Sequence, residues 1–599
     1  MMRKLPAFSA ACVVISLALF SACGSDSGGT ASGGAGSGQG GSGPSVGGNA
    51  GTAGSSANGG SHGGQAGAPA TGGTSSGDSG AAGEAGTAGT SLEPPGKTAL
   101  QPLPVDGFYP RVLKRANGTI VASVVAGQKS GNLGGTILES TDDGLTFQVI
   151  GHIDEPLASG GLCCGTLYEL PHALGALPAG TLLWSASVGS NQKTEPMKLP
   201  VWSSADGGRT WSPLSTIIGP FTDSTHRSVW EPEFSLLDDG TLVCHFSDET
   251  DPKHSQKLVA VRTTDGKIWS APKDTVALST FGYRPGMAVV RRAPSGVFFM
   301  SYEVCGVPGD SCAAHVRTSP DGWDWGTATD IGDRPVTVDG KHFLHAPTIM
   351  WSDAPSQLGR LFLVGQVATD TDGNPAAENG NFVMVNAQGG KQFWYGIEAP
   401  VLVNPAPYDN FCPNYSSPLV ALDGGRVGLE LASRWDGKIC RTYFARGPLL
   451  GSGDATGIID GEVYHLVNVT SGLCLEVVGD STQAHALVEQ TTCATSALQD
   501  WAISAAANGA FSIKAQNSVK CLAPAGSEKN GTLIEQNDCD GSAAQSWNFR
   551  AVGPGYFELV EDGGACLDNP AASTKPGTNF QLWTCNDLSP QIWHLELQK

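Results

Sequence analysis

Short runs rich in Val, Phe, Thr and Tyr, broken by Gly and Asp turns, fill the chain from about residue 98 to residue 451. No long stretch with a 3.6-residue hydrophobic period interrupts them. This alternation of extended runs and tight turns predicts an all-β domain, which we place at residues 97–455.

One turn pattern recurs inside this domain, with copies that begin at Ser140, Ser204, Thr263 and Ser319, steps of 64, 59 and 56 residues. In each copy an Asp can bond turn amides, a Gly takes a positive φ, and an aromatic residue packs beneath. A worn fifth copy covers 386–394. The copies resemble the Asp-box of sialidase-like β-propellers, and the step predicts about six four-stranded blades closed by the N-terminal strand. We expect the box aspartates to be structural: Asp142, Asp206, Asp265 and Asp321.

The segment 228–234, SVWEPEF, carries the strongest candidate chemistry. In an extended strand Glu231 and Glu233 point to one face, while Trp230 and Phe234 occupy the other. The segment itself contains no lysine or arginine to neutralise them, so inward carboxylates indicate a function. The alternative is an edge strand with solvated glutamates.

A second glutamate, Glu303, lies on the run before the fourth box, whereas Glu231 opens the blade of the third. The two therefore belong to adjacent blades. A retaining glycosidase needs two carboxyl groups close together, one attacking the anomeric carbon and one protonating the leaving oxygen. The acid needs a raised pKa, which burial or the second carboxylate can supply.

Five motifs together resemble family 93 of the glycoside hydrolases: Phe108-Tyr-Pro-Arg111, Trp230-Glu-Pro-Glu-Phe234, Ser247-Asp-Glu249, Tyr283-Arg-Pro-Gly-Met287 and Tyr302-Glu-Val-Cys-Gly306. The resemblance implies a retaining exo-α-1,5-L-arabinanase on a six-bladed propeller, releasing arabinobiose, with Glu231 as acid/base and Glu303 as nucleophile. We expect substrate contacts at the same mouth from Arg111, Trp230, Glu233, Tyr283, Arg284 and Tyr415. No cofactor or metal is expected.

Two alternatives remain at this point. In a sialidase, Arg111, Arg284 and Arg434 could form an arginine triad and Tyr415 the catalytic tyrosine, although no early catalytic Asp is evident. A propeller without catalysis could instead act as an adhesin, but such a protein would be expected to lose one of the two glutamates.

The segment 461–599 repeats every 46 residues, at Gln499-Asp-Trp501, Gln545-Ser-Trp547 and Gln591-Ile-Trp593. A cysteine pair precedes each Gln. These features resemble the ricin-B-type β-trefoil lectins, in which the tryptophans are expected to fill the core. The third repeat also has the sugar-binding residues of that family, Asp568, Trp583 and Asn586, with Gln591 behind them, so we expect one competent lobe.

The N-terminal region predicts export. Residues 1–22 resemble a lipoprotein signal peptide, with Cys23 as the lipidated residue and ordinary cleavage as the alternative. Residues 23–96 are almost entirely Gly, Ser, Ala and Thr and predict a flexible tether. We therefore expect an extracellular or cell-surface monomer that contacts the membrane only through its lipid.

Charge and cysteine content narrow the partners further. The formal net charge of −21 disfavours nucleic acid or an anionic membrane surface as a partner, and the two family resemblances imply a polysaccharide partner. In an exported chain the 13 cysteines after Cys23 are disulfide candidates. We expect Cys305–Cys312, Cys412–Cys440 and the three lectin pairs, with at least one propeller cysteine unpaired; the adjacent Cys163 and Cys164 have no sequence-based explanation.

Overall fold

The computed structural model describes residues 97–189, 197–221, 228–309, 312–352, 360–386, 389–391, 394–404, 412–425, 427–449, 458–506, 509–553 and 555–598. The expected signal peptide, Cys23 and the tether lie outside the described residues. Among the described residues, no helix is both long enough and apolar enough to cross a bilayer.

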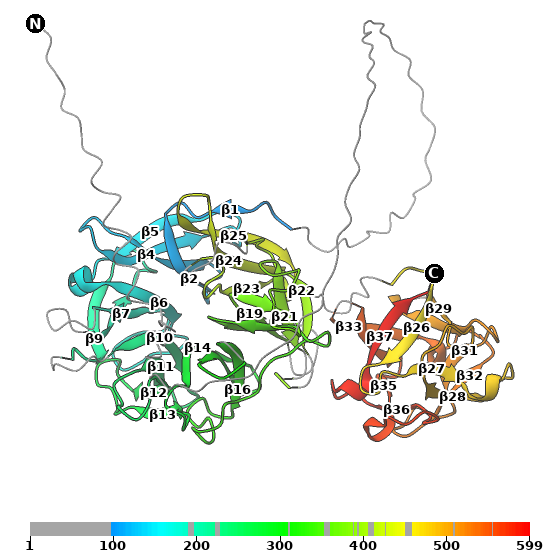
Figure 1. Ribbon diagram of the computed structural model, residues 1–599. Coiled ribbons are helices and arrows are strands. Elements are labelled where there is room, and N and C mark those ends of the chain that lie inside the picture. The colour runs from blue at the N-terminus through cyan, green and yellow to red at the C-terminus, as the bar shows by residue number, and fades with distance from the viewer. Residues whose placement is uncertain are drawn as a thin grey trace, which may run out of the picture. The chain divides into compact units, whose positions relative to one another are not determined.

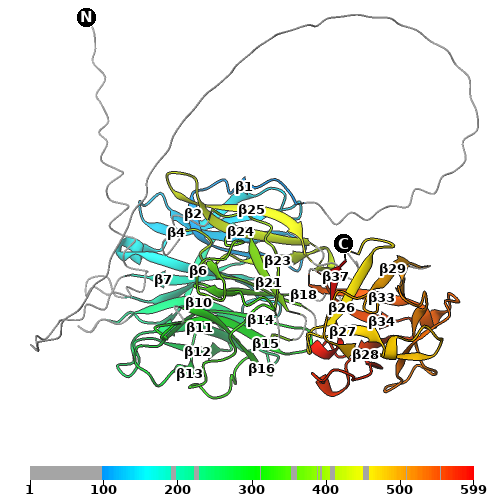
Figure 2. The same ribbon diagram turned by 45° about the vertical axis from the view of Figure 1, so that its right-hand side comes forward.

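The first half of the propeller is three four-stranded antiparallel sheets. Blade 1 contains β2 (Gly107–Lys114), β3 (Ile120–Gly127), β4 (Leu133–Ser140) and β5 (Gln148–Ile153). Blade 2 contains β6 (Leu162–Glu169), β7 (Leu182–Val188), β8 (Leu199–Ser204) and β9 (Ser212–Ile218), and the 3₁₀ helix η2 (Pro156–Gly160) precedes it. Blade 3 contains β10 (Val229–Leu236), β11 (Leu242–Asp248), β12 (Lys257–Thr263) and β13 (Lys273–Val276). Its strands follow one another outward in both views (Figure 1 and Figure 2).

The second half closes the ring. Blade 4 joins β14 (Arg284–Arg292), β15 (Phe298–Cys305) and β16 (Ala313–Ser319) to β17 (His342–Leu344) and β20 (Val367–Thr369). Blade 5 contains β18 (Thr348–Ser352), β19 (Arg360–Val364), β21 (Phe382–Asn386) and β22 (Tyr395–Glu398). Blade 6 contains β23 (Leu419–Leu422), the 3₁₀ turn η3 (Asp423–Gly425), β24 (Val427–Trp435) and β25 (Cys440–Pro448). The N-terminal β1 (Gln101–Pro102) pairs with β25, which confirms the predicted closure.

The innermost strands form a continuous ring about the central axis, as Figure 1 shows for β2, β6, β10 and β14. Each inner strand contacts the next in the order β2, β6, β10, β14, β18 and β23, and β23 contacts β2 again. Large apolar side chains such as Trp184, Phe234 and Phe298 are fully buried within this propeller. The prediction of an all-β, six-bladed propeller is confirmed.

The Asp-box turns lie in the outer hairpins and hold their own backbone. In the first, Asp142 accepts hydrogen bonds from the backbone amides of Leu145 and Thr146. The Ser140 hydroxyl accepts a hydrogen bond from the Gly144 amide. In the worn fifth copy Asn386 accepts the Gly390 amide proton in place of the serine. The boxes are therefore structural turns, as predicted.

The C-terminal domain folds as a β-trefoil from twelve described strands. They are β26 (Val463–Asn468), β27 (Cys474–Val477), β28 (Ala486–Thr491), β29 (Trp501–Ala505), β30 (Phe511–Ala515), β31 (Cys521–Pro524), β32 (Ile534–Asn537), β33 (Trp547–Gly553), β34 (Tyr556–Glu561), β35 (Ala565–Asp568), β36 (Gln581–Thr584) and β37 (Ile592–Leu597). Short 3₁₀ turns are η4 (Val478–Asp480), η6 (Ala543–Gln545), η7 (Pro570–Ala572) and η8 (Ser589–Gln591).

The three repeat tryptophans occupy equivalent core positions. Trp501, Trp547 and Trp593 are fully buried. Each indole N–H donates to the carbonyl of a leucine one residue after a cysteine, namely Leu475, Leu522 and Leu567. The prediction that these tryptophans fill a threefold core is confirmed.

The expected disulfides form, Cys305–Cys312 and Cys412–Cys440 in the propeller and one pair in each trefoil lobe. The adjacent Cys163 and Cys164 are bonded to each other. Among the described cysteines Cys244 is free, and it is buried.

Candidate active site

The six inner strands share one irregularity at equivalent positions. Four of them, β2, β6, β10 and β14, shift register by a bulge whose first unpaired residue has a positive φ. Just before each of β18 and β23, a residue likewise has a positive φ. Together these positions form a ring of six non-glycine residues with φ between 47° and 63°: Tyr109, Cys164, Glu231, Met287, Ala346 and Ser416. A bulge with a left-handed residue re-aims a side chain. The ring is therefore where the propeller turns six side chains away from ordinary strand directions.

Glu231 belongs to this ring, which breaks the simple alternation assumed from the sequence. The register shift falls between Trp230 and Glu233, so the shared face expected for the two glutamates does not follow from strand periodicity. The expectation that no cation neutralises them is wrong for Glu233. Arg291 of β14 contacts its Oε1 at 2.6 Å, and the Thr166 hydroxyl donates to its Oε2 at 3.0 Å. Both carboxylate oxygens of Glu233 thus already bond to protein groups.

The Glu231 carboxyl bonds only uncharged donors in the described part of the chain. Its Oε2 accepts from the Ser247 hydroxyl at 2.6 Å and from the Met287 amide at 3.0 Å. Burial, reinforced by the nearby charge of Glu303, raises the pKa of Glu231 to about 7 against the opposing effect of these hydrogen bonds. Such a group can hold a proton near neutral pH and release it on demand.

Glu303 lies across the same edge of blade 4. It pairs in register with Gly286, the residue before Met287, so β14 brings the two carboxyls into one site. Its Oε2 accepts the Ala346 amide proton at 2.7 Å and lies 3.6 Å from Nδ1 of His345. Glu303 is 7% exposed. The predicted pair is therefore brought together, although the sequence assigned no site role to His345, Ala346 or Met287.

On the blade 1 side the guanidinium of Arg111 lies 4.3 Å from the Tyr109 ring centroid and donates to the Pro110 and Ser416 carbonyls. Tyr109 and Tyr415 rings pack with centroids 5.9 Å apart. Burial raises the pKa of Tyr109 to about 12, with Glu231 adding to the rise, so the phenol stays protonated beside the carboxyls. Arg111 and Tyr415 thus lie with Tyr109 near Glu231, and the sequence had assigned no site role to Tyr109.

On the rim, Arg284 is held by several partners. It contacts Glu249 at 2.5 Å and donates to Gln256 and to the Ser255 carbonyl. An arginine committed to a carboxylate is a poor member of a free anion-binding triad, which disfavours the sialidase alternative. Trp230 and Tyr283 are half-buried and pack against the apolar clusters of blades 1 to 4.

One group of potential metal ligands surrounds the nucleophile candidate. Ligand-type atoms of Glu303, Cys305, Cys312 and His345 lie within 4.8 Å of one another. The two sulfurs, however, are bonded to each other, so they offer no thiolate for a metal. A disulfide sulfur also carries no proton, and the 3.5 Å approach of Cys305 Sγ to Glu303 Oε1 is a contact without donation.

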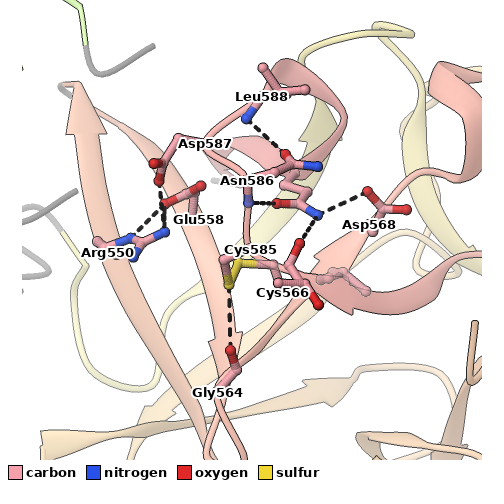
Figure 3. The surroundings of a disulfide bond; sticks show 12 residues. Arg550, Glu558, Gly564, Cys566, Asp568, Cys585, Asn586, Asp587 and Leu588 are labelled. Atoms are coloured by element: carbon pink, nitrogen blue, oxygen red, sulfur yellow. Dashed lines mark hydrogen bonds and ion pairs between the residues drawn. A yellow bond between two sulfur atoms is a disulfide. The ribbon is translucent and has the colours of Figure 1, made fainter. Parts of the chain in front are cut away.

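The third trefoil lobe carries the second predicted site, shown around its disulfide Cys566–Cys585 in Figure 3. The buried Gln591 donates from Nε2 to Asp568 Oδ1 at 3.1 Å and accepts the Asn586 amide proton at 2.8 Å. Trp583, on the neighbouring strand β36, is 41% exposed. Gln591 therefore orients Asp568, while Trp583 and Asn586 remain open to solvent.

The other two lobes differ at the same positions. In the first, Gln499 donates to Glu476 at 2.7 Å, but Thr491 stands where the third lobe has its exposed tryptophan. In the second, Ala523 replaces the acid and the equivalent Gln545 donates to the Asp538 carbonyl instead. The acid and the aromatic coincide only in the third lobe.

Comparisons with known proteins divide the chain. Residues 456–537 and 543–599 match the family model of the ricin-type β-trefoil lectin domain-like proteins. An α-L-arabinanase of Penicillium chrysogenum complexed with arabinobiose is similar in structure, with 24% identity, 58% of this chain and 96% of that chain covered, and a TM-score of 0.49. An α-L-arabinofuranosidase of Fusarium graminearum with an iminosugar inhibitor gives 23% identity, 58% and 98% coverage, and a TM-score of 0.48. No curated protein matches the chain.

Proposed function

We propose that this protein is a retaining exo-acting glycoside hydrolase of α-1,5-linked arabinan, with a lectin domain that holds it on polysaccharide. The observation that carries the proposal is the unequal pair of carboxyls. Glu231 accepts hydrogen bonds from uncharged donors and has a pKa of about 7. One oxygen of Glu303, by contrast, accepts a hydrogen bond from a backbone N–H and lies beside the His345 imidazole. The substrate class follows from the five motifs that resemble the arabinanases.

The proposed reaction has two steps. In the first, Glu303 attacks the anomeric carbon while Glu231 gives its proton to the departing glycosidic oxygen, and the sugar becomes an ester of Glu303. In the second, the ionised Glu231 takes a proton from water, the water oxygen attacks the anomeric carbon, and the Glu303 carboxylate leaves. The same Glu231 oxygen that accepts from Ser247 and Met287 stays oriented through both steps.

Substrate binding is assigned to the residues around this pair. Trp230, Tyr283 and Tyr415 offer aromatic faces to a sugar, and Arg111 offers guanidinium N–H groups. Glu233 and Arg284 are occupied by Arg291 and Glu249, and we assign them to holding the mouth in shape. Arabinobiose as the product is part of the proposal.

The deciding experiment is incubation of the purified protein with linear arabinan, branched arabinan, xylan and sialyllactose, followed by chromatography of the products. Arabinobiose from linear arabinan, absent with the Glu303→Gln variant, is the expected result. Release of sialic acid would replace the proposal with the sialidase alternative. No release from any substrate would support a binding protein instead.

We further propose that Cys23 is lipidated and that a monomer is displayed at the cell surface. A basic start followed by an apolar run and small residues before Cys23 supports this. Incorporation of labelled palmitate into the wild type, but not into Cys23→Ser, is expected. Size-exclusion chromatography of the soluble portion tests the monomer.

A further inference from the structure

The two candidate carboxyls raise a question that the pair alone does not answer, namely which one keeps the proton. A retaining mechanism needs Glu231 protonated and Glu303 ionised at the same pH. Two neighbouring carboxyls share one proton according to the charges around each. The residues that contact Glu231 directly, Ser247 and Met287, are uncharged donors.

Glu303 differs because an imidazole faces it. Nδ1 of His345 lies 3.6 Å from Oε2, the same oxygen that accepts the Ala346 amide proton at 2.7 Å. The His345 side chain is 29% exposed, so protons can reach it from solvent. Within the described chain, Glu303 is the titratable group that faces the His345 imidazole. The adjoining Cys305–Cys312 disulfide does not titrate.

The backbone around His345 is built to hold this position. His345 and Ala346 have φ values of 61° and 47°, two consecutive left-handed residues without glycine. The His345 amide donates to the Cys312 carbonyl, and the His345 carbonyl accepts from the Gln366 amide. Conformations of this kind are strained and persist where neighbours enforce them, commonly at functional sites.

We propose that His345 is a positioning residue for the nucleophile: as an imidazolium it holds Oε2 of Glu303, keeps that carboxylate ionised, and thereby leaves the shared proton on Glu231. The proposal rests on the proposed function. Since Oε2 is engaged by His345 and Ala346, Oε1 is the oxygen presented to the anomeric carbon. The interaction with Glu303 also raises the pKa of His345 against the opposing effect of burial, so the cation persists at higher pH than in a free histidine.

The test is His345→Asn, because asparagine tolerates a positive φ and carries no charge. We expect kcat on linear arabinan to fall about 30-fold, which is about 2 kcal/mol, with KM changed less than twofold. In a plot of kcat/KM against pH, the acidic limb should move to higher pH. Without the His345 imidazolium beside it, Glu303 competes better for the proton that it shares with Glu231. A residue that only supports the fold would not move that limb.

An aryl arabinoside with a good leaving group separates this defect from loss of the acid. It should rescue the first step in Glu231→Gln but not in His345→Asn, because attack by Glu303 is impaired in the latter. His345→Lys, which restores a cation, should return the acidic limb toward the wild-type position. If His345→Asn keeps the wild-type pH profile and kcat, the inference is wrong. If the wild-type protein itself releases nothing from arabinan, the proposed function has failed rather than the role of His345.

Discussion

Replacing Glu231 by glutamine is expected to slow arabinan hydrolysis by about 10²–10⁴-fold, because the leaving oxygen loses its proton donor. Glutamine has nearly the same volume as glutamate. Its side-chain oxygen can still accept from the Met287 amide, which lies 3.0 Å away in the wild type. The substitution should therefore remove the chemistry and leave the propeller folded.

The raised pKa of Glu231 determines how much of the protein carries the catalytic proton at neutral pH. A glutamic acid with its ordinary pKa of 4.5 would be protonated in about 0.3% of molecules at pH 7, whereas a pKa of about 7 protonates about half. The site therefore increases the fraction competent as an acid by about 150-fold. Wild-type activity should fall as the pH rises through about 7, since ionised Glu231 cannot donate, and this basic limb should be lost in Glu231→Gln.

Azide rescue assigns the roles of the two glutamates. If Glu231 is the acid/base, azide should attack the glycosyl-enzyme of Glu231→Gln and give an arabinosyl azide with the configuration of the substrate. In Glu303→Gln, azide attacking the substrate directly should give the inverted product. Product configuration read by NMR decides between them, and the opposite outcome in the two variants would exchange the roles. Near-wild-type turnover of Glu231→Gln on arabinan would refute the assignment of Glu231 altogether.

The same substitution should stabilise the folded protein by an amount that depends on pH. The folded-state pKa of Glu231 is raised, so its contribution to stability is present below pH 4.5 and is lost as the pH rises through about 7. Glutamine cannot ionise. The Tm of Glu231→Gln should therefore exceed that of the wild type by more at pH 8 than at pH 5, measured by scanning calorimetry.

Glu303→Gln should lower kcat on arabinan by several orders of magnitude while circular dichroism stays unchanged, and retained turnover would exclude it as the nucleophile. Trp583→Ala should abolish retention on a polysaccharide column while the matched Thr491→Ala, at the equivalent first-lobe position, leaves it intact; equal retention would mean that the third lobe is not the binding lobe. Arg291→Met should lower the free energy of unfolding by about 2 kcal/mol, because it strands the buried carboxylate of Glu233, a value reduced for the partial exposure of the arginine; an unchanged midpoint in urea would contradict this.

Much of the fold was accessible from local sequence because its signals are local. An Asp-box needs only a hydroxyl, an Asp and a Gly within a few residues to satisfy its own turn amides, so each copy can be read without its neighbours. The trefoil was likewise predictable from three Gln-x-Trp units, since each tryptophan makes the same bond within its own repeat. The disulfide Cys305–Cys312 was suggested by its short separation of 7 residues, whereas Cys412–Cys440, separated by 28 residues, matched a pairing that spacing alone does not fix.

The environment of the candidate site was less accessible because it is made across blades. Arg291 is 58 residues from Glu233, and no sequence window shows that they form an ion pair. His345 is 42 residues beyond Glu303 and belongs to the turn before the next blade. The one available signal was the Tyr-Pro, Glu-Pro and Ala-Pro pairs at three of the six left-handed positions, which mark equivalent points on inner strands.

The sequence by itself determined the two domains, the number of blades and the presence of Glu231 and Glu303 in adjacent blades, because periodicity and turn chemistry act over a few residues. Only the tertiary structure decided what those carboxyls are. Glu231 has its raised pKa because ring closure buries it beside Glu303, and Glu233 is neutralised because β14 brings Arg291 to it. Burial and through-space charge depend on residues far apart in the chain, which is why the six inner strands had to be assembled before the roles could be separated.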